Sequence, residues 1–299
     1  MKILLLGKNG QVGWELQRSL APLGELVALD RAGDADRRLC GDLQDLDGLR
    51  STVHALQPDV IVNAAAHTAV DRAESEPELA RRLNAEAPSV LAEAARATGA
   101  WLVHYSTDYV FDGSGTEPWR EDATTGPLNV YGRTKLEGEH AIARACPRHL
   151  VLRTSWVYAA RGGNFARTML RLAAEREQLT VIDDQLGAPT GAELIADVTA
   201  HAIRQLRQRP QDAGIYHLAA TGATSWHGYA RFVLDAARAL RPDMKLAVRD
   251  LAAVPSSAFP TPARRPHNSR LDSRRLQDVF GLRLPPWQEG VMRMLTEIL

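Results

Sequence analysis

The chain has 299 residues, and its 36 lysines and arginines balance its 36 aspartates and glutamates, so the formal net charge at pH 7 is zero. This balance argues against a nucleic-acid-binding protein, because phosphate affinity needs a concentrated basic face. The 45% hydrophobic content argues against an acidic disordered chain. The length is ample for one large core or for two unequal lobes.

The cysteines and the apolar runs indicate the compartment. Cys40 and Cys146 are too few for a disulfide scaffold and have no metal-ligand spacing. Ile3 to Leu6 is too short for the apolar region of a signal peptide, and no run approaches the ~20 residues of a membrane helix. We therefore expect a cytoplasmic protein without a membrane partner.

The first half alternates short apolar runs with helical patterns. Each run is bounded by turn or polar residues, as buried parallel strands are. The alternation predicts a Rossmann-type, doubly wound parallel sheet of the α/β class, with helices on both faces. The expected strands are Lys2–Leu6, Leu26–Asp30, Asp59–Asn63, Trp101–Ser106 and Leu150–Thr154, and the expected helices are Gln11–Leu20, Asp45–Leu56, Pro77–Thr98 and Tyr131–Ala145.

The second half is less regular. Its connection Ala252–Ser269 contains four prolines, which disfavour both a helix and a central strand. We predict a dinucleotide-binding domain over 1–155 and a smaller α/β substrate-binding lobe mainly over 156–299, with later segments returning to the first domain. The expected helices are Phe165–Glu177, Ala192–Arg207, Trp226–Ala239, Ser273–Phe280 and Trp287–Leu299.

A glycine-rich loop directly follows the first expected strand and opens a helix. Gly7, Gly10 and Gly13 have GxxGxxG spacing, which differs from the commoner GxGxxG. Glycines permit a tight turn, a close backbone approach to a pyrophosphate and close packing of helix on strand. The helix start presents free N–H groups to the phosphates. The loop therefore predicts a bound dinucleotide.

Two acidic residues are expected near the rest of this dinucleotide. Asp30 ends the second expected strand, 17 positions after Gly13, where a carboxylate can accept both ribose hydroxyls. This favours NAD, although Arg31 beside it could meet a 2′-phosphate and leaves NADP open. Asp42 lies where a third strand would end and could meet the adenine.

A Tyr–Lys pair supplies the expected acid–base chemistry. Tyr131 and Lys135 are four positions apart, so they share one face of a helix. There the ammonium would lower the pKa of the phenol from about 10. A tyrosine so tuned can protonate a carbonyl oxygen. Thr107 directly follows the strand expected over Trp101–Ser106, and the carboxyl ends of strands are where open α/β sheets bind their ligands.

Together these motifs resemble the extended short-chain dehydrogenase/reductase family, almost from end to end. The one departure is that Gly7 follows Leu6 directly, without the Thr that many relatives place there. The resemblance rests on GKNGQVGWELQ, VNAAAHTAVDRAE, HYSTDYVFDG, PLNVYGRTKLEGE, RTSWVYA, GAPTGAELIAD and PTPARRPHNSRL.

The resemblance implies hydride transfer from NADH or NADPH to C4 of a dTDP-sugar, dTDP-4-dehydro-β-L-rhamnose. Tyr131 would protonate the alkoxide, Lys135 would tune Tyr131, and Thr107 would bind the substrate. The implied cofactor-binding residues are Gly7, Gly10, Gln11, Val12, Gly13, Asp30, Asp42, Leu43, Ala66, His67, Tyr105, Tyr131 and Lys135, and the implied substrate-binding residues are Thr107, Asp108, Trp156 and Arg264.

Several of these assignments have structural alternatives. His67 fits a hydrogen-bonding residue at a strand end equally well, and a buried Trp156 would suit a core. The arginines at 264 and 265 suit a diphosphate, but they also suit ion pairs on a solvated loop.

The resemblance also implies a homodimer and a Mg²⁺ site at its contact. The matching carboxylates are Glu15, Glu193 and Glu297. Mg²⁺ suits oxygen ligands, but these residues have no spacing signal, and from the sequence alone solvated helix faces explain them better.

Two other functions stay open at this stage. A sugar-nucleotide epimerase or dehydratase shares the glycine loop and YxxxK, but dehydratases tend to have Asp-Glu where this chain has Asp108-Tyr109. A non-catalytic, NADP-binding regulatory subunit shares the fold. It would have no need of Thr107, Tyr131 and Lys135.

Overall fold

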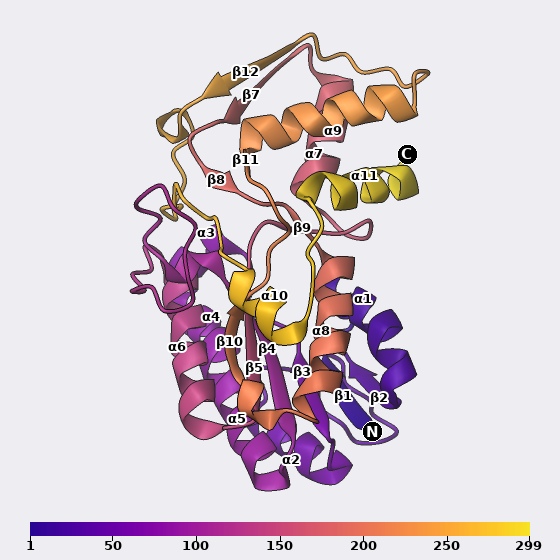
Figure 1. The fold of residues 1–299 in the computed structure, drawn as a ribbon, viewed down its shortest axis with the longest axis vertical. Helices are drawn as coiled ribbons and strands as arrows, with labels where there is room; N and C mark the ends of the chain where they lie inside the picture. The colour runs from indigo at the N-terminus through magenta and orange to yellow at the C-terminus, as the bar shows by residue number, and fades with distance from the viewer.

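The computed structural model describes all residues, 1–299, and a six-stranded parallel sheet forms its larger part (Figure 1). The strand order is β10-β5-β4-β3-β1-β2, so the chain reverses direction across the sheet at β1. This confirms the predicted fold class, with five strands close to their expected bounds. The strands are β1 (Lys2–Leu6), β2 (Glu25–Leu29), β3 (Val60–Asn63), β4 (Trp101–Thr107), β5 (His149–Thr154) and β10 (Gly214–His217).

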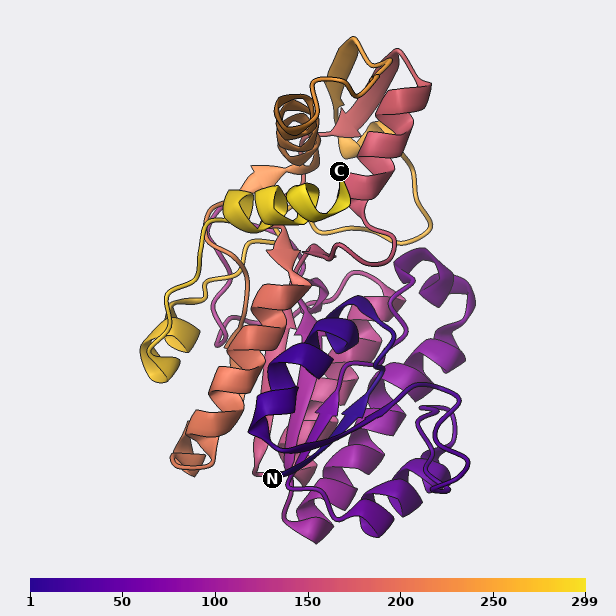
Figure 2. The same ribbon diagram turned by 90° about the vertical axis from the view of Figure 1, so that its right-hand side faces the viewer.

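Helices cover both faces of this sheet (Figure 2). Successive strand residues point to opposite faces, so Ile3 and Leu5 belong to one buried cluster while Leu4 and Leu6 belong to the other. The first cluster includes apolar residues of α1 (Gln11–Leu20), α8 (Ala192–Leu206) and α10 (Arg274–Phe280); the second includes those of α2 (Leu46–Leu56), α5 (Ala87–Thr98) and α6 (Val130–Ala145).

The helix predicted over Pro77–Thr98 is interrupted. It consists of α4 (Pro77–Arg81), a π-helical turn (Arg82–Glu86) and α5, and a further short helix, α3 (Val70–Ser75), precedes it. Pro88 has no N–H, so it cannot donate to the carbonyl of Asn84 as a regular helix would require. That carbonyl packs instead against α6, where a Cβ on Gly138 would lie 2.1 Å from it.

A smaller lobe lies above the carboxyl ends of the strands (Figure 1). Its aromatic and aliphatic core joins three helices, α7, α9 and α11. The elements are α7 (Phe165–Glu175), α9 (Trp226–Leu240), α11 (Trp287–Ile298) and the two-stranded sheets β7 (Gln178–Ile182) with β12 (Asp250–Val254), β8 (Leu186–Gly187) with β11 (Thr224–Ser225), and β6 (Val157–Tyr158) with β9 (Thr190–Gly191).

The connection expected over Ala252–Ser269 begins inside a strand. Its first three residues belong to β12, which pairs in parallel with β7. This agrees with the expectation of no helix and no central strand, because β12 has a neighbour on one side only and the prolines begin at Pro255, beyond its last residue. The rest forms loops and a short 3-10 helix, Ser256–Ala258.

The part of the chain that follows β5 contributes elements both to the smaller lobe and to the region of the large sheet. α8 packs against α1, and β10 pairs with β5 at the edge of the large sheet. β10 was not predicted, because it is only four residues long and starts with a glycine. None of the helices is long and apolar enough to cross a membrane.

Candidate functional site

A cavity of about 900 Å³ opens at the carboxyl ends of β1, β3 and β4. It lies where the strand order reverses, the place at which open α/β sheets bind ligands. Of the proposed cofactor and substrate residues, all but Gly13, His67 and Arg264 line it. The lining set is Gly7, Gly10, Gln11, Val12, Asp30, Asp42, Leu43, Ala66, Tyr105, Thr107, Asp108, Tyr131, Lys135 and Trp156.

The glycine loop forms a close-fitting turn at one end of this cavity. Gly7 has a φ of +86°, and a Cβ there would lie 2.8 Å from the backbone nitrogen of Ala65. Gly13 lies behind the loop, where a Cβ would come within 2.0 Å of the Gly7 carbonyl oxygen. Each glycine is therefore required by backbone packing.

The start of α1 is chemically suited to an anion. Gly10 caps the helix without a side-chain hydrogen bond, and no acidic residue lies in its first turn. Unsatisfied N–H groups and the positive end of the helix dipole therefore face the cavity. This cradle fits the pyrophosphate of a dinucleotide.

Asp30 lies at the expected ribose end of the cavity. Burial opposes its ionisation, but the N–H of Ala32, together with Lys8 and Asn9, outweighs burial and lowers the pKa of Asp30. Asn9 Nδ2 donates to Asp30 Oδ2 at 2.8 Å. The result is a fixed, ionised acceptor.

Asp42 also lines the cavity, but no third strand ends there. The segment before it forms a turn closed by an antiparallel bridge between Asp34 and Leu39. The predicted strand was wrong, because this segment pairs with itself instead of extending the sheet. Arg31 Nε lies 3.2 Å from Asp42 Oδ2, so the two predicted adenosine-side groups pair with each other.

Thr107 and Tyr131 are brought together by the end of β4 and the first turn of α6. Asn129 caps α6, because its Oδ1 accepts from the N–H of Gly132 at 2.8 Å. Thr107 is the last residue of β4, one residue beyond the strand expected over Trp101–Ser106. Its hydroxyl lies 3.1 Å from Asp108 Oδ1.

Lys135 does not have the predicted effect on Tyr131. Burial raises the pKa of Tyr131 to about 12, although the nearby Thr107 hydroxyl works in the opposite direction. The predicted lowering was wrong because Lys135 Nζ turns away, toward the carbonyl of Tyr105 at 2.6 Å and His104 Nε2 at 3.1 Å. Tyr131 is consequently protonated at neutral pH, as a proton donor must be.

Besides Gln11 Oε1 in the first turn of α1, four polar atoms of the cavity wall have no partner within the protein. They are buried, and buried polar atoms are rarely left unpaired. Asp108 is among them, and burial raises the pKa of this carboxyl to about 7. We infer that ligand groups complete this set, which comprises Ser106 Oγ, Asp108 Oδ2, Thr154 Oγ1 and Ser155 Oγ.

Trp156 and Trp226 cover the cavity from the side of the smaller lobe. Their rings stack with centroids 3.6 Å apart and planes inclined by 13°. Trp156 has a φ of +49°, a strained conformation of the kind that recurs at functional sites. From the sequence, Trp226 was predicted only to lie on a helix. No local pattern indicates that it lines the cavity, because that position depends on α9 lying over the cavity.

The predicted residues that do not line this cavity are Gly13, which lies behind the glycine loop, His67 and Arg264. His67 is buried, and its Nε2 lies 3.3 Å from Glu76 Oε2, which fits the hydrogen-bonding alternative. Arg264 lines a second cavity of about 760 Å³ with Arg265 and His267. Arg265 Nη2 lies 2.7 Å from Asp71 Oδ2 and so ties this loop to the start of α3.

The three predicted metal ligands do not form a ligand set within the chain. Glu15 and Glu297 contribute to the raised pKa of Glu193, after the larger effect of burial, so the three carboxylates approach one another. No group of three carboxylate, histidine or cysteine side chains is close enough to hold a metal ion. Arg18 and Arg293 pair with Glu15 and Glu297, respectively.

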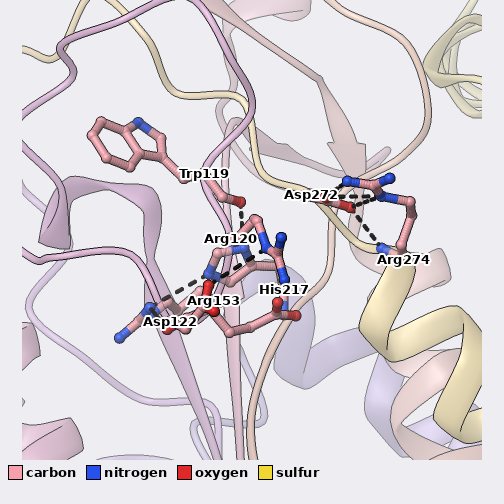
Figure 3. Close-up of polar contacts among 8 residues, drawn as sticks. Trp119, Arg120, Asp122, Arg153, His217, Asp272 and Arg274 are labelled. Atoms are coloured by element: carbon pink, nitrogen blue, oxygen red, sulfur yellow. Dashed lines mark hydrogen bonds and ion pairs between the residues drawn. The ribbon is translucent and has the colours of Figure 1, made fainter.

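A buried ion pair supports α6 beneath the site. Arg153 Nη2 lies 2.7 Å from Glu139 Oε2, and both side chains are almost fully buried. His217 from β10 approaches Arg153, with its Nε2 3.4 Å from Arg153 Nη1, and its Nδ1 lies 3.0 Å from the carbonyl oxygen of Trp119 (Figure 3). Burial first, and then Arg153, lowers the pKa of His217 to about 3, so this histidine is neutral.

The chain is similar to known proteins over its whole length. The chain is 61% identical over 298 residues to the dTDP-4-dehydrorhamnose reductase of Salmonella typhimurium, covering 100% of this chain and 98% of the relative. The reductase of Burkholderia thailandensis is 48% identical over 303 residues, covering 100% of this chain and 99% of the relative.

Solved structures show the same architecture. The dTDP-4-dehydrorhamnose reductase of Bacillus anthracis, in complex with NADP, has a TM-score of 0.84 and 32% identity, covering 98% of each chain. The UDP-glucose 4-epimerase of Thermus thermophilus, at 21% identity, shares the fold, with a TM-score of 0.79 over 100% of this chain and 99% of that chain. The model described as the RmlD substrate binding domain matches residues 1–299, and the chain therefore belongs to that family.

Proposed function

We propose that the chain reduces dTDP-4-dehydrorhamnose to dTDP-rhamnose with NADPH or NADH. The observation that carries the proposal is the position of Thr107, Tyr131 and Lys135 on the wall of the cavity that also contains the glycine loop. The relatives that bear this name match the chain over its whole length. Cofactor and proton donor would thus meet at one place.

The residues of the first domain fit a nicotinamide dinucleotide. The start of α1 would hold the pyrophosphate, and Asp30 would accept the ribose hydroxyls when the cofactor is NADH. The bound cofactor supplies a hydride to the keto carbon. Lys135 and Tyr105 would lie beside the nicotinamide end, since both line the same cavity.

Tyr131 would then supply the proton. Hydride addition makes the keto oxygen basic, and a phenol with a pKa raised to about 12 holds its proton until that charge develops. Thr107 would donate to the same oxygen. Asp108, with Thr154 and Ser155, would pair with sugar hydroxyls through the atoms that lack partners.

The smaller lobe would bind the rest of the sugar nucleotide. Trp156 offers a flat face to the sugar, and Arg264 lines the second cavity, where its guanidinium suits a diphosphate. Asn129 Nδ2 donates to the Arg264 carbonyl at 2.8 Å, which couples this loop to the cap of α6. Substrate binding and the position of Tyr131 would therefore be linked.

The direct test measures loss of NADPH or NADH absorbance with purified protein and dTDP-4-dehydrorhamnose. We expect substrate-dependent oxidation with at least one cofactor, and a sugar product reduced at C4. Stoichiometric cofactor turnover separates a reductase from an epimerase, which regenerates its cofactor. Oxidation that does not depend on the sugar nucleotide would refute the assignment.

We also propose a cytoplasmic homodimer. Because the three glutamates do not form a site in one chain, any Mg²⁺ would need further ligands from water or a second chain. Size-exclusion chromatography with light scattering, run with Mg²⁺ and with EDTA, tests the dimer and the contribution of Mg²⁺ to its assembly. A monomer under both conditions would exclude the dimer, and a dimer unaffected by EDTA would exclude a role for the metal in assembly.

A further inference from the structure

A buried glutamine connects the walls of the two cavities described above. Gln185 is 6% exposed, and it lines the second cavity together with Ser256. Its Oε1 accepts from the indole N–H of Trp226 at 3.2 Å, and Trp226 lines the first cavity. One amide group therefore belongs to the wall of one cavity and holds a side chain of the other.

The partners of Gln185 fix the orientation of its amide. An indole N–H only donates, so the amide oxygen must face Trp226. The amide nitrogen then faces Ser256, and Nε2 donates to Ser256 Oγ at 3.0 Å. The opposite orientation would set the amide N–H groups against the indole N–H, with two donors face to face and neither paired.

Asp184 holds Ser256 in the accepting position. The backbone N–H of Ser256 lies 2.9 Å from each carboxylate oxygen of Asp184, and the Ser256 hydroxyl donates to Oδ1. Burial opposes the ionisation of Asp184, but these bonds, together with His267, outweigh burial and lower the pKa of this carboxyl. The ionised carboxylate only accepts. The hydroxyl hydrogen of Ser256 is thus committed to Asp184, and its oxygen is left to accept from Gln185.

Trp226 in turn supports Trp156. The two rings stack with centroids 3.6 Å apart. Gly187 passes so close to the Trp156 ring that a Cβ at this glycine would lie 2.6 Å from Cε2. Phe165 also packs on Trp226, with centroids 4.6 Å apart, but it offers no acceptor for the indole N–H. Packing alone would let the Trp226 ring turn in its own plane, and the hydrogen bond to Gln185 prevents that rotation.

We propose that Gln185 is a positioning residue that holds Trp226, and through it Trp156, over the first cavity from the wall of the second. Gln185 itself does not line the first cavity, so its loss leaves the groups around Tyr131 in place and loosens only the tryptophan wall.

This inference rests on the proposed function, in which a nucleoside-diphosphate sugar spans both cavities, with its sugar at Trp156 and its diphosphate near Arg264. The wall that meets the nucleotide is then also the wall that orients the tryptophans. Recognition of the nucleotide and recognition of the sugar are joined through one amide group.

The stacked tryptophans give a spectroscopic test that needs no substrate. Two stacked indoles couple their electronic transitions and produce two circular-dichroism bands of opposite sign, which Trp226→Phe should abolish. Gln185→Met keeps the size of the side chain and removes the amide. We expect the amplitude of the two bands to fall about twofold in this variant, because one orientation of the ring is no longer selected.

Gln205→Met is the matched control. Gln205 Nε2 donates to the carbonyl of Val279 at 2.6 Å and so joins α8 to the end of α10, apart from both cavities. Its loss should leave the amplitude of the two bands unchanged.

Ser256→Ala tests the part of this arrangement that belongs to the second cavity. It removes the acceptor of Gln185 without touching the tryptophans, and the amplitude should fall by less than in Gln185→Met. Because Ser256 acts through Gln185, the double variant should lose no more than Gln185→Met alone. A full additional loss in the double variant, or an unchanged amplitude in folded Gln185→Met, would overturn the proposal.

Steady-state kinetics connect the spectrum to the reaction. In Gln185→Met we expect the KM for the sugar nucleotide to rise about fivefold, the loss of one hydrogen bond, while kcat and the Kd of the cofactor change less than about twofold. A fall in kcat at constant KM would contradict a positioning role at the tryptophans. Since the dichroism is recorded without substrate, a failure here is distinguishable from a failure of the reductase assignment.

Discussion

The large sheet and the smaller lobe build their parts of the site in different ways. The sheet offers mainly backbone and strand ends: the start of α1, the turn at Gly7 and the carboxyl end of β4. The lobe offers side chains, above all Trp226, which reaches the cavity from a helix far along the chain. Backbone N–H groups bind a phosphate whatever the neighbouring side chains are, whereas the contribution of the lobe depends on the side chains that it carries.

The two regions also differ in their cores. In the large part, two apolar clusters sandwich one continuous sheet. The lobe has one main aromatic cluster and only two-stranded sheets. We expect substitutions in the large part to affect catalysis or folding, and substitutions in the lobe to affect substrate affinity.

Tyr131→Phe tests the chemical contribution of the large part and should have the largest effect. Loss of the proton donor should lower kcat by about 10²- to 10⁴-fold, while the Kd of the cofactor changes less than about twofold, since packing is conserved. Stopped-flow turnover and fluorescence titration measure the two quantities.

Tyr229→Phe is the matched control, because its hydroxyl is buried without a partner and belongs to the lobe. Unchanged turnover in Tyr131→Phe would remove this residue from the mechanism.

Glu139→Gln tests the support beneath α6. It leaves the Arg153 guanidinium buried without a counter-charge, and we expect a loss of about 3 to 5 kcal/mol in the free energy of unfolding. Glu175→Gln breaks an exposed pair with Arg171 and should cost less than about 0.5 kcal/mol. Equal effects in urea titrations would contradict the assigned importance of the buried pair.

Trp226→Ala tests the lobe. Removing the stacked ring should free Trp156 and raise the KM for the sugar nucleotide about tenfold, equivalent to about 1.4 kcal/mol. The Kd of the cofactor should stay constant. The KM of Trp226→Phe for the sugar nucleotide should lie between those of the unaltered protein and of Trp226→Ala. A change in cofactor binding alone would show that Trp226 contributes to binding the cofactor and not the sugar nucleotide.

Asp30→Ala tests cofactor choice and should have the smallest effect. The lost carboxylate should weaken NADH several-fold and NADPH less, because the phosphate of NADPH is repelled by that same charge. Asp36→Ala removes an exposed charge from the following turn and serves as the control. Equal weakening of both cofactors, measured by titration, would show that Asp30 does not discriminate between them.

Much of the large part was predictable because its determinants are local. The first strand, the turn at Gly7 and the helix that follows it are consecutive, and each short apolar run of the first half marks a strand through its own composition. The order of strand, loop and helix then places the cofactor site at one edge of the sheet. The Tyr131 and Lys135 pair also lies on a single helix.

The elements that escaped prediction depend on partners distant in sequence. β10 is a strand because β5, more than sixty residues earlier, offers it an edge. β7 and β12 form their sheet across a similar separation. Periodicity reports the side chains of one segment, and it contains no information about the segment that will pair with it.

The sequence by itself therefore determined the fold class, and it predicted the cofactor cradle and the proposed proton donor, since each is a property of contiguous residues. Tertiary structure alone decided the direction of the pKa shift of Tyr131, the stacking of Trp156 on Trp226 and the partners of Lys135. These depend on burial and on contacts between remote elements. The spacing of Tyr131 and Lys135 put both residues on one helix, but His104 and the Tyr105 carbonyl fixed where the lysine points.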